Sequence, residues 1–153
     1  METPNLTLVP CTADEVLTRV ERMPPEQRAE VSLDWLTRVR DKADVWTLGF
    51  SIVHRETGHV IGTCGFKGPP SLDGIVEIAY GISPNEQGKG YATEAADALV
   101  RYAIDSGQVR LVIAHTLMQN KPSQRVLIKC GFEYVGEVMD PEDGLVLRWI
   151  KTI

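Results

Sequence analysis

The hexapeptide Gln87-Gly88-Lys89-Gly90-Tyr91-Ala92 joins two segments of different periodicity. Residues 75–82, before it, alternate apolar side chains as a half-buried strand does, and residues 92–103, after it, are strong helix formers. A glycine-rich turn that opens a helix gathers backbone N–H groups at the positive end of the helix dipole. The hexapeptide therefore predicts an anion site suited to a pyrophosphate, and an ordinary glycine-rich connection is the alternative.

Two other phosphate-binding motifs do not fit this segment. A dinucleotide fingerprint needs a third glycine where Thr93 stands, and an acid at the end of the next predicted strand, residues 109–117. That strand instead runs into Met118-Gln119-Asn120. The P-loop pattern fails as well, because no Gly-Lys-Ser/Thr follows four variable residues after a glycine. A nucleotide-binding oxidoreductase is therefore a weak hypothesis.

The hexapeptide resembles the Gln/Arg-x-x-Gly-x-Gly/Ala signature with which the GNAT superfamily of N-acetyltransferases holds the pyrophosphate of acetyl-coenzyme A. The downstream residues are similar to the RimJ/RimL-like branch of that superfamily, which contains ribosomal-protein N-terminal acetyltransferases. They are Asn120-Lys-Pro-Ser123 and, after a short predicted helix, Gly131-Phe132. Pro122 suits the first turn of that helix, and Gly131 suits its C-terminal cap.

Periodicity along the chain predicts a mixed α/β domain, in which a strand, two helices and a three-strand meander precede alternating strands and helices. The expected helices are 12–22, 25–40, 92–106 and 122–130, and the expected strands are 6–9, 44–54, 59–66, 75–82, 109–117, 132–138 and a last segment after residue 144. The GNAT fold has this order: a mixed, mostly antiparallel twisted sheet of about seven strands with helices on both faces. We expect residues 1–153 to form a single domain of this kind.

Composition and charge limit the classes of partner. The formal net charge of −5 is spread evenly and argues against a nucleic-acid partner, which would favour a basic face. No apolar run has the length of a membrane span, and the N-terminus lacks the features of a signal peptide. Cys11, Cys64 and Cys130 match no metal motif, so we expect reduced thiols, no metal and a cytoplasmic protein. A homodimer is left open.

Glu77 is the first candidate for the base that takes a proton from an acceptor amine. It lies on the strand that leads into the glycine turn, and its apolar neighbours Val76 and Ile78 face the opposite way. The resemblance implies the same role, because many GNAT relatives use a glutamate on this strand. His115 is the second candidate, since an imidazole titrates near neutral pH. A solvated acid and a structural histidine are the respective alternatives.

Ser123 is the candidate for contact with the departing thiolate. Many GNAT enzymes carry a tyrosine acid seven residues after the Asn120 position, but this chain has Leu127 there. The resemblance to the RimJ/RimL-like branch implies that Ser123 takes that role, and that Asn120 holds an amide of the pantetheine arm. A helix cap is the alternative for both residues.

The end of the strand 75–82 is expected to offer backbone groups to pantetheine, where this strand parts from the next. The site that the resemblance implies for acetyl-coenzyme A comprises Tyr80, Gly81, Ile82, Gln87, Gly88, Lys89, Gly90, Tyr91, Ala92, Thr93, Asn120 and Ser123.

The resulting hypothesis is an enzyme that moves an acetyl group directly from acetyl-coenzyme A to a primary amine, at a protein N-terminus or on a small molecule. The acids of the last loop, Asp140, Glu142 and Asp143, are candidates for selecting a cationic amine, and a plain turn is the alternative. Three aromatic residues, Trp35, Trp46 and Phe66, are candidates for lining the pocket of that amine, and core packing is the alternative. A non-catalytic acyl-coenzyme-A-binding or sensor module is the second hypothesis, which the leucine at position 127 favours.

Overall fold

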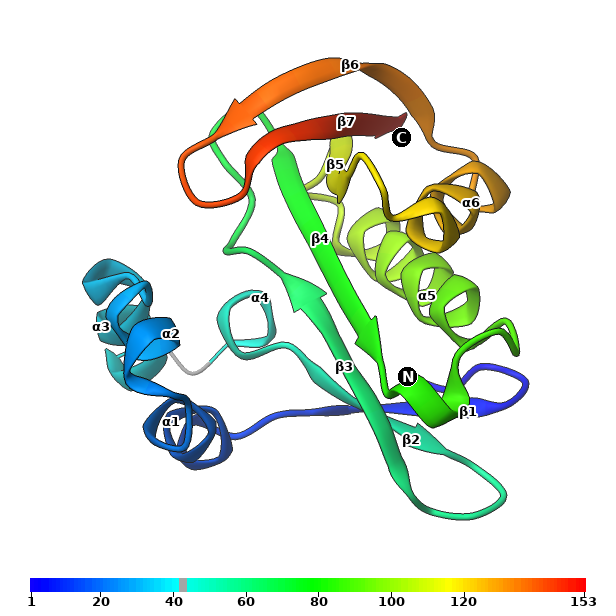
Figure 1. Ribbon diagram of the computed structural model, residues 1–153. Coiled ribbons are helices and arrows are strands. Elements are labelled where there is room, and N and C mark those ends of the chain that lie inside the picture. Colours follow the sequence, from blue (N-terminus) through cyan, green and yellow to red (C-terminus); the bar gives the residue numbers. More distant parts are fainter. Residues whose placement is uncertain (42–43) are drawn as a thin grey trace.

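Seven strands form one sheet in the computed structural model, which describes residues 1–41 and 44–153 (Figure 1). The strands are β1 (Leu6–Pro10), β2 (Phe50–His54), β3 (Val60–Phe66), β4 (Ile75–Ile82), β5 (Leu111–Leu117), β6 (Glu133–Asp140) and β7 (Gly144–Thr152). Their order across the sheet is β1-β2-β3-β4-β5-β7-β6. Neighbouring strands pair in antiparallel fashion except β4 and β5, which are parallel. The predicted mixed, mostly antiparallel sheet is confirmed.

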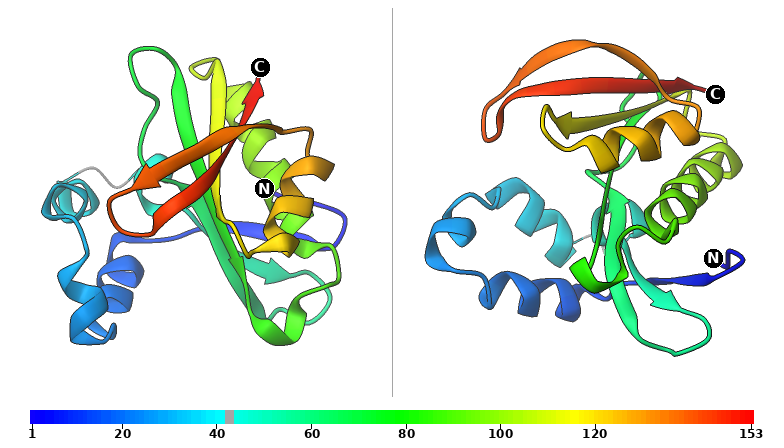
Figure 2. Two further views of the ribbon diagram at one scale, coloured as in Figure 1. Left: turned by 45° about the horizontal axis from the view of Figure 1, so that its top comes forward. Right: turned by 45° about the vertical axis from the view of Figure 1, so that its right-hand side comes forward.

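Helices lie on both sides of this sheet, as predicted (Figures 1 and 2). They are α1 (Ala13–Glu21), α2 (Pro25–Ala29), α3 (Leu33–Asp41), α4 (Val45–Leu48), α5 (Tyr91–Ser106) and α6 (Lys121–Lys129), with one 3₁₀ turn at Pro84–Glu86. The long helix α5 and the shorter α6 pack together on one face. The first three helices form a separate group on the other side, and α4 lies between that group and β3.

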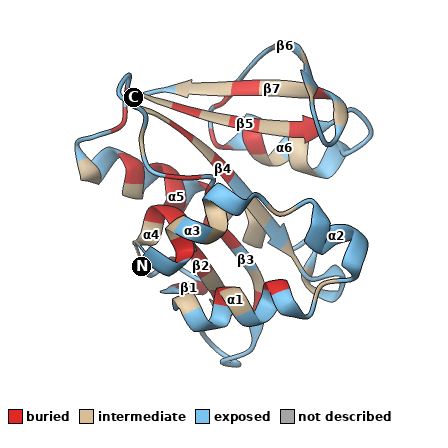
Figure 3. Cartoon of the chain, turned by 90° about the vertical axis from the view of Figure 1, so that its left-hand side faces the viewer, coloured by how far each residue is buried: buried red, intermediate tan, exposed pale blue. Residues whose placement is uncertain are grey.

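The main hydrophobic core lies between α5 and the strands (Figure 3). Alanines fill most of the buried face of this helix, and Leu99 between them is completely buried. Because alanine side chains are short, α5 approaches the sheet closely while keeping strong helix propensity. A smaller core, built on Val16 of α1 and Val39 of α3, holds the first helices together.

The predicted helix at residues 12–22 is confirmed as α1, but the predicted single helix at 25–40 is wrong. The structure divides that segment into α2 and α3. Ser32 causes the division, because its hydroxyl accepts a hydrogen bond from the Trp35 N–H at 3.3 Å and so caps a new helix. A serine inside a helix pattern is therefore the signal that the prediction passed over.

The predicted strand at residues 44–54 is correct only from Phe50 onward. Asp44 caps the short helix α4, with its carboxylate accepting from the Thr47 N–H at 2.9 Å. Gly49 ends the helix with a φ of 73°, a conformation that other residues adopt at a cost. The alternating apolar pattern of this segment thus concealed a capped helical turn, and Trp46 enters the main core from that turn rather than from a strand.

Strands β4 and β5 separate after a short region of pairing. Their parallel register covers Ile75 with Leu111, Val76 with Val112 and Glu77 with Ile113. Beyond Glu77, β4 continues to Ile82 with registered partners on β3. The sheet therefore opens into a wedge along the second half of β4, as the sequence predicted.

Candidate active site

The glycine turn between β4 and α5 has the left-handed backbone that its composition suggests. Gly88 has a φ of 78°, and Gly90, the N-cap of α5, has a φ of 85°. A Cβ at either position would meet open space, so the backbone conformation, and not crowding, favours glycine there. The side-chain amide of Gln87 donates to the Ile82 carbonyl at 2.8 Å and ties the turn to the end of β4.

A cavity of about 470 Å³ lies against this turn and the first turn of α5. Its lining includes every residue that the resemblance implied for acetyl-coenzyme A except Lys89. The ammonium of Lys89 instead pairs with the Glu86 carboxylate at 3.1 Å. The structure thus brings together segments around positions 80, 90 and 120 in one cavity at the opening of the β4/β5 wedge.

The cavity also contains two cationic residues that the sequence analysis missed. Arg125 and Lys129 of α6 line it, together with Glu86, Pro122 and Val126. A spacing of four residues places Arg125 and Lys129 on one face of a helix, and that face begins at Pro122. This spacing was a readable signal, but it gained meaning only once α6 was placed opposite the glycine turn.

Residues from the N-terminal segment and β2 hold the start of α5. The Glu94 carboxylate accepts hydrogen bonds from the Thr3 hydroxyl at 2.6 Å and from the Asn5 backbone and side-chain N–H groups at 3.0 and 2.7 Å. Burial raises the pKa of Glu94, but these hydrogen bonds outweigh it and leave the pKa below its ordinary value. His54 Nε2 lies 3.0 Å from the Tyr91 hydroxyl. The helix end that borders the cavity is therefore anchored from outside it.

Asn120 and Ser123 lie where the cavity meets the wedge. Asn120 is the N-cap of α6, because its side-chain oxygen accepts from the Ser123 N–H at 3.2 Å. The Ser123 hydroxyl does not cap that helix; it lies 3.0 Å from the Tyr80 hydroxyl on β4. Leu127 is completely buried in the main core, one turn further along the helix. Position 127 therefore faces the core, and the polar groups at this end come from Ser123 and Tyr80.

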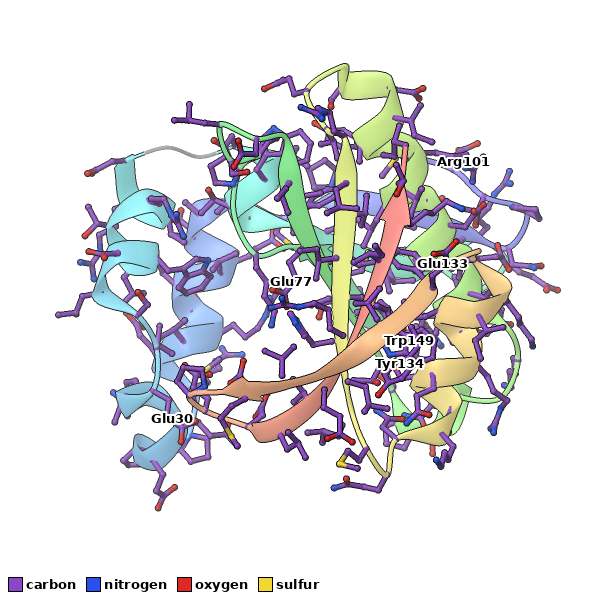
Figure 4. The ribbon with its side chains drawn as sticks, turned by 90° about the horizontal axis from the view of Figure 1, so that it is seen from above. Glu30, Glu77, Arg101, Glu133, Tyr134 and Trp149 are labelled. Atoms are coloured by element: carbon purple, nitrogen blue, oxygen red, sulfur yellow. The ribbon has the colours of Figure 1, made fainter. Side chains whose placement is uncertain are left out.

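Glu77, which is labelled in Figure 4, lies on the face of β4 opposite to Tyr80. Its carboxylate belongs to a chain of polar contacts. Its Oε2 accepts from Lys67 Nζ at 2.8 Å and lies 3.0 Å from His115 Nδ1, while Arg148 Nε donates to His115 Nε2 at 3.0 Å. Arginine can only donate, so His115 Nε2 accepts and the ring proton lies on Nδ1, facing Glu77. Both ring nitrogens of His115 are thus engaged, and the structure brings both base candidates into one chain.

Lys67 remains a cation beside this carboxylate. Burial lowers the pKa of Lys67, but the hydrogen bond and charge of Glu77, with smaller contributions from Asp140 and Asp143, raise it above its ordinary value overall. The Lys67 ammonium therefore occupies one side of the Glu77 carboxylate at neutral pH.

Two further cavities open on the Glu77 face of the sheet. One, of about 180 Å³, is lined by Glu77, His115, Asn120 and Ser123, and the acids Asp140 and Asp143 also line it. The other, of about 490 Å³, lies between β3 and the first helices, with Arg19 and Trp35 in its lining. Lys67, Ala79 and Tyr80 line both cavities, so the two adjoin across the middle of β4.

Of the remaining candidates from the sequence, some line a cavity and others pack in the core or close a turn. Trp35 and Phe66 line the larger of these two cavities, whereas Trp46 packs on Phe66 with ring centroids 4.6 Å apart inside the core. The Asp140 carboxylate accepts from the Glu142 and Asp143 N–H groups at 2.8 and 2.9 Å, which closes the last hairpin turn. These two hydrogen bonds lower the pKa of Asp140. Asp140 thus serves the turn while also bordering the smaller cavity.

All three cysteines are buried and free. Burial raises the pKa of Cys64, which lines the larger cavity, to about 12 and that of Cys130 to about 11. Both side chains therefore remain thiols at neutral pH, which makes them poor nucleophiles. Within residues 1–41 and 44–153, no group of three or more His, Cys, Asp or Glu side chains is arranged to hold a metal ion, and no helix is long and apolar enough to cross a membrane.

A family model for the acetyltransferase (GNAT) domain matches residues 5–133, which is most of the chain. The chain belongs to the GNAT acetyltransferase family. This membership agrees with the sheet order, the glycine turn and the wedge described above.

Individual GNAT relatives support the same assignment. An uncharacterized N-acetyltransferase, p20, from Bacillus licheniformis is 38% identical over 93 residues, which cover 61% of this chain and 52% of the relative. This chain thus spans about half the length of that relative. A ribosomal-protein-S5-alanine acetyltransferase from Vibrio fischeri has the same fold, with a TM-score of 0.74 at 15% identity over 99% of this chain and 95% of that one. The microcin C7 self-immunity acetyltransferase MccE, solved with acetyl-CoA and AMP, has a TM-score of 0.71 at 20% identity over 99% and 94% of the two chains.

Proposed function

We propose that this protein is an N-acetyltransferase that uses acetyl-coenzyme A and transfers the acetyl group directly to a primary amine. One observation carries the proposal: a single cavity runs from the glycine turn to Ser123 at the open wedge of the sheet, and Glu77 lies on the other side of the same strand. A pyrophosphate site, a channel for an extended arm and a basic group thus follow one another along β4. The structure of MccE with acetyl-CoA supports this choice of acyl donor.

We infer that each end of the cavity holds a different part of acetyl-coenzyme A. The N–H groups of residues 88–93 suit the pyrophosphate, because the first turn of a helix has unpaired donors and a positive dipole end. Arg125 and Lys129 add positive charge for the phosphates. The backbone of Tyr80, Gly81 and Ile82, which has no registered β5 partner, suits the amide groups of pantetheine.

The proposed chemistry takes place where the cavity meets the Glu77 face. The nitrogen of a neutral amine attacks the thioester carbonyl carbon, a C–N bond forms, the C–S bond breaks, and the electron pair leaves on sulfur. Glu77, directly or through a water molecule, takes the proton that the nitrogen loses. The Ser123 hydroxyl donates a hydrogen bond to the developing thiolate. His115 orients Glu77 in this scheme, because both of its ring nitrogens already have partners.

We infer that the acceptor enters over the two adjoining cavities on the Glu77 face. They are large enough for the end of a peptide or for a small-molecule amine, and the proposal covers both. The RimJ/RimL-like resemblance favours a protein N-terminus.

The same proposal includes the setting in which the protein works. Three buried, free cysteines suit a reducing compartment, so we propose a cytoplasmic location. A net charge of −5 favours neither nucleic acid nor an anionic membrane surface as a partner. Light scattering on the purified chain would establish whether it works as a monomer or as a homodimer.

Calorimetry and a thiol-release assay together test the function. We expect acetyl-coenzyme A to bind, and free thiol to appear when peptides with a free N-terminus or small primary amines are added. Binding without turnover on any amine would favour the alternative, a non-catalytic acyl-coenzyme-A-binding module. Absence of acetyl-coenzyme A binding by the folded protein would contradict both.

A further inference from the structure

The phenol of Tyr80 reaches the same serine that the proposed chemistry uses. Its hydroxyl oxygen lies 3.0 Å from Ser123 Oγ and 3.3 Å from the Ser123 carbonyl oxygen, so its single proton can be donated to either atom, and Oγ is the nearer of the two. This pair joins the second half of β4, which is one side of the wedge, to the first turn of α6, the helix that follows β5 in the chain. Tyr80 also lines all three cavities described above. It therefore lies at the point where the acyl-donor cavity and the Glu77 face meet.

The arrangement leaves the serine hydroxyl free to donate. Asn120 already accepts from the Ser123 N–H, so the hydroxyl has no capping role. A serine hydroxyl has one proton and can accept two hydrogen bonds, so it can accept from a phenol while donating elsewhere. Tyr80 has a proton to give, because burial raises its pKa despite an opposing effect of the Ser123 hydrogen bond.

We propose that Tyr80 is a positioning residue for thiolate departure: its O–H donates to Ser123 Oγ and directs the Ser123 O–H toward the sulfur of the leaving group. This inference rests on the proposed acetyl transfer. Sequence analysis gave Tyr80 only backbone contacts with pantetheine, and its side-chain role rests on the 3.0 Å distance between the two hydroxyl oxygens.

Two hydroxyls in series stabilise a thiolate better than one. When the C–S bond breaks, the electron pair goes to sulfur and the Ser123 O–H strengthens its hydrogen bond to it. The serine oxygen then gains negative character, which strengthens the bond that it accepts from Tyr80. No proton has to leave either residue. The proton that the amine loses goes to Glu77 and then to solvent, and the thiolate is protonated by solvent after release.

Other ionisable groups near the phenol do not take part in the proposed contact with the thiolate. Cys130 on the α6 side is a buried thiol, whereas Glu77 and His115 face the opposite side of β4 and bind each other. Arg125 and Lys129 line the acyl-donor cavity and do not line the cavity that contains Glu77.

The test measures the bound leaving group itself as well as turnover. Titration of coenzyme A in complex with the protein, followed by the ultraviolet absorbance of the thiolate, reports how well the site stabilises that species. We expect Tyr80→Phe to raise the apparent pKa of the bound thiol by about one unit and to lower kcat about tenfold. The KM for acetyl-coenzyme A should change less than about twofold, because a ground-state thioester sulfur is a poor hydrogen-bond acceptor. Tyr102→Phe, which removes a phenol in the aromatic cluster around Trp46, is the matched control and should change neither quantity.

A double variant separates positioning from an independent effect. If Tyr80 acts through Ser123, the Tyr80→Phe/Ser123→Ala variant should be no slower than Ser123→Ala alone. Additive losses, or an unchanged titration of the bound thiol in Tyr80→Phe, would overturn the inference. Failure of the unmodified protein to bind coenzyme A would instead contradict the proposed function, so the two failures are distinguishable.

Discussion

Glu77 and His115 are joined by a hydrogen bond of 3.0 Å between Oε2 of the carboxylate and Nδ1 of the ring. The two residues lie on the parallel strands β4 and β5, close to the point where these strands separate. Arg148 occupies the other ring nitrogen at 3.0 Å, so the imidazole has no free lone pair with which to accept a substrate proton. The geometry therefore supports Glu77 over His115 as the base.

Glu77→Gln should lower kcat by roughly a hundredfold while leaving affinity for acetyl-coenzyme A unchanged, because it removes a base but retains shape. The loss should shrink as pH rises and more of the acceptor is already neutral. His115→Asn should cost about tenfold or less, since it removes only the residue that orients the base. Steady-state kinetics across pH would decide which of the two residues is the base, with Glu133→Gln on β6 as a matched control. A larger loss for His115→Asn than for Glu77→Gln would reverse the assignment.

Gly90→Asp should abolish binding of acetyl-coenzyme A without unfolding the protein. A side chain at a φ of 85° costs about 1–2 kcal/mol of stability, and the new carboxylate would repel phosphate oxygens. Gly90→Asn separates these two effects, because asparagine has nearly the same shape and tolerates the left-handed region. Calorimetry should show the asparagine variant binding at least tenfold more tightly than the aspartate variant, by about 1.4 kcal/mol or more. Equal affinities of the two variants for acetyl-coenzyme A would contradict an anion site at this turn.

Arg125→Gln and Lys129→Gln should each weaken acetyl-coenzyme A binding by about tenfold, through loss of attraction to phosphate. The loss should diminish at high salt, because these side chains border solvent. Arg101→Gln provides the control, since Arg101 lies on the exposed face of α5 and pairs with Asp97 at 3.6 Å. Titrations of each variant with acetyl-coenzyme A at two ionic strengths measure both the loss of affinity and its dependence on salt. Affinities that stay unchanged in both cavity variants would place the phosphates elsewhere.

Glu94→Gln should destabilise the protein at neutral pH and not at low pH. The folded pKa of Glu94 lies below its ordinary value of 4.5, so its stabilisation is present above that value and disappears as pH falls through the folded pKa. The carboxylate is partly exposed and therefore screened by solvent, so we expect a decrease of only about 1–2 °C in Tm. Thermal melts of both proteins at neutral and acidic pH check this. A Tm difference that persists in acid would mean that shape, and not charge, explains the effect.

The sequence was most informative where one residue type allows only one backbone. Glycines 88 and 90 predicted the turn before α5, and the alternation of residues 75–82 predicted β4 with correct boundaries. It was misleading where a cap competes with a periodic pattern. Ser32 interrupts an apparent helix, and Asp44 with Gly49 turns the start of an apparent strand into a helical turn. Each error reflects a single side-chain hydrogen bond that periodicity does not record.

The sequence indicated candidate site residues where a local segment carries the signal. It did not indicate the residues whose role depends on a partner from another segment. Glu77, Ser123 and the glycine turn followed from local pattern and resemblance. The Tyr80 phenol, the Lys67 ammonium and the Arg148 guanidinium acquire their significance only from partners on other strands or helices. Such partners depend on which strands adjoin, and the chain alone does not specify that adjacency.

The early separation of β4 and β5 leaves an unfinished strand edge in the middle of the sheet. Elsewhere, an exposed edge is a template on which another chain can add a strand and begin to aggregate. Here α6 lies beside this edge, the Tyr80–Ser123 contact joins the two, and residues of both line the acyl-donor cavity. An acyl donor that hydrogen-bonds along β4 would complete the sheet as a missing strand does. Binding would then consolidate the fold itself, and slower amide hydrogen exchange in β4 would report it.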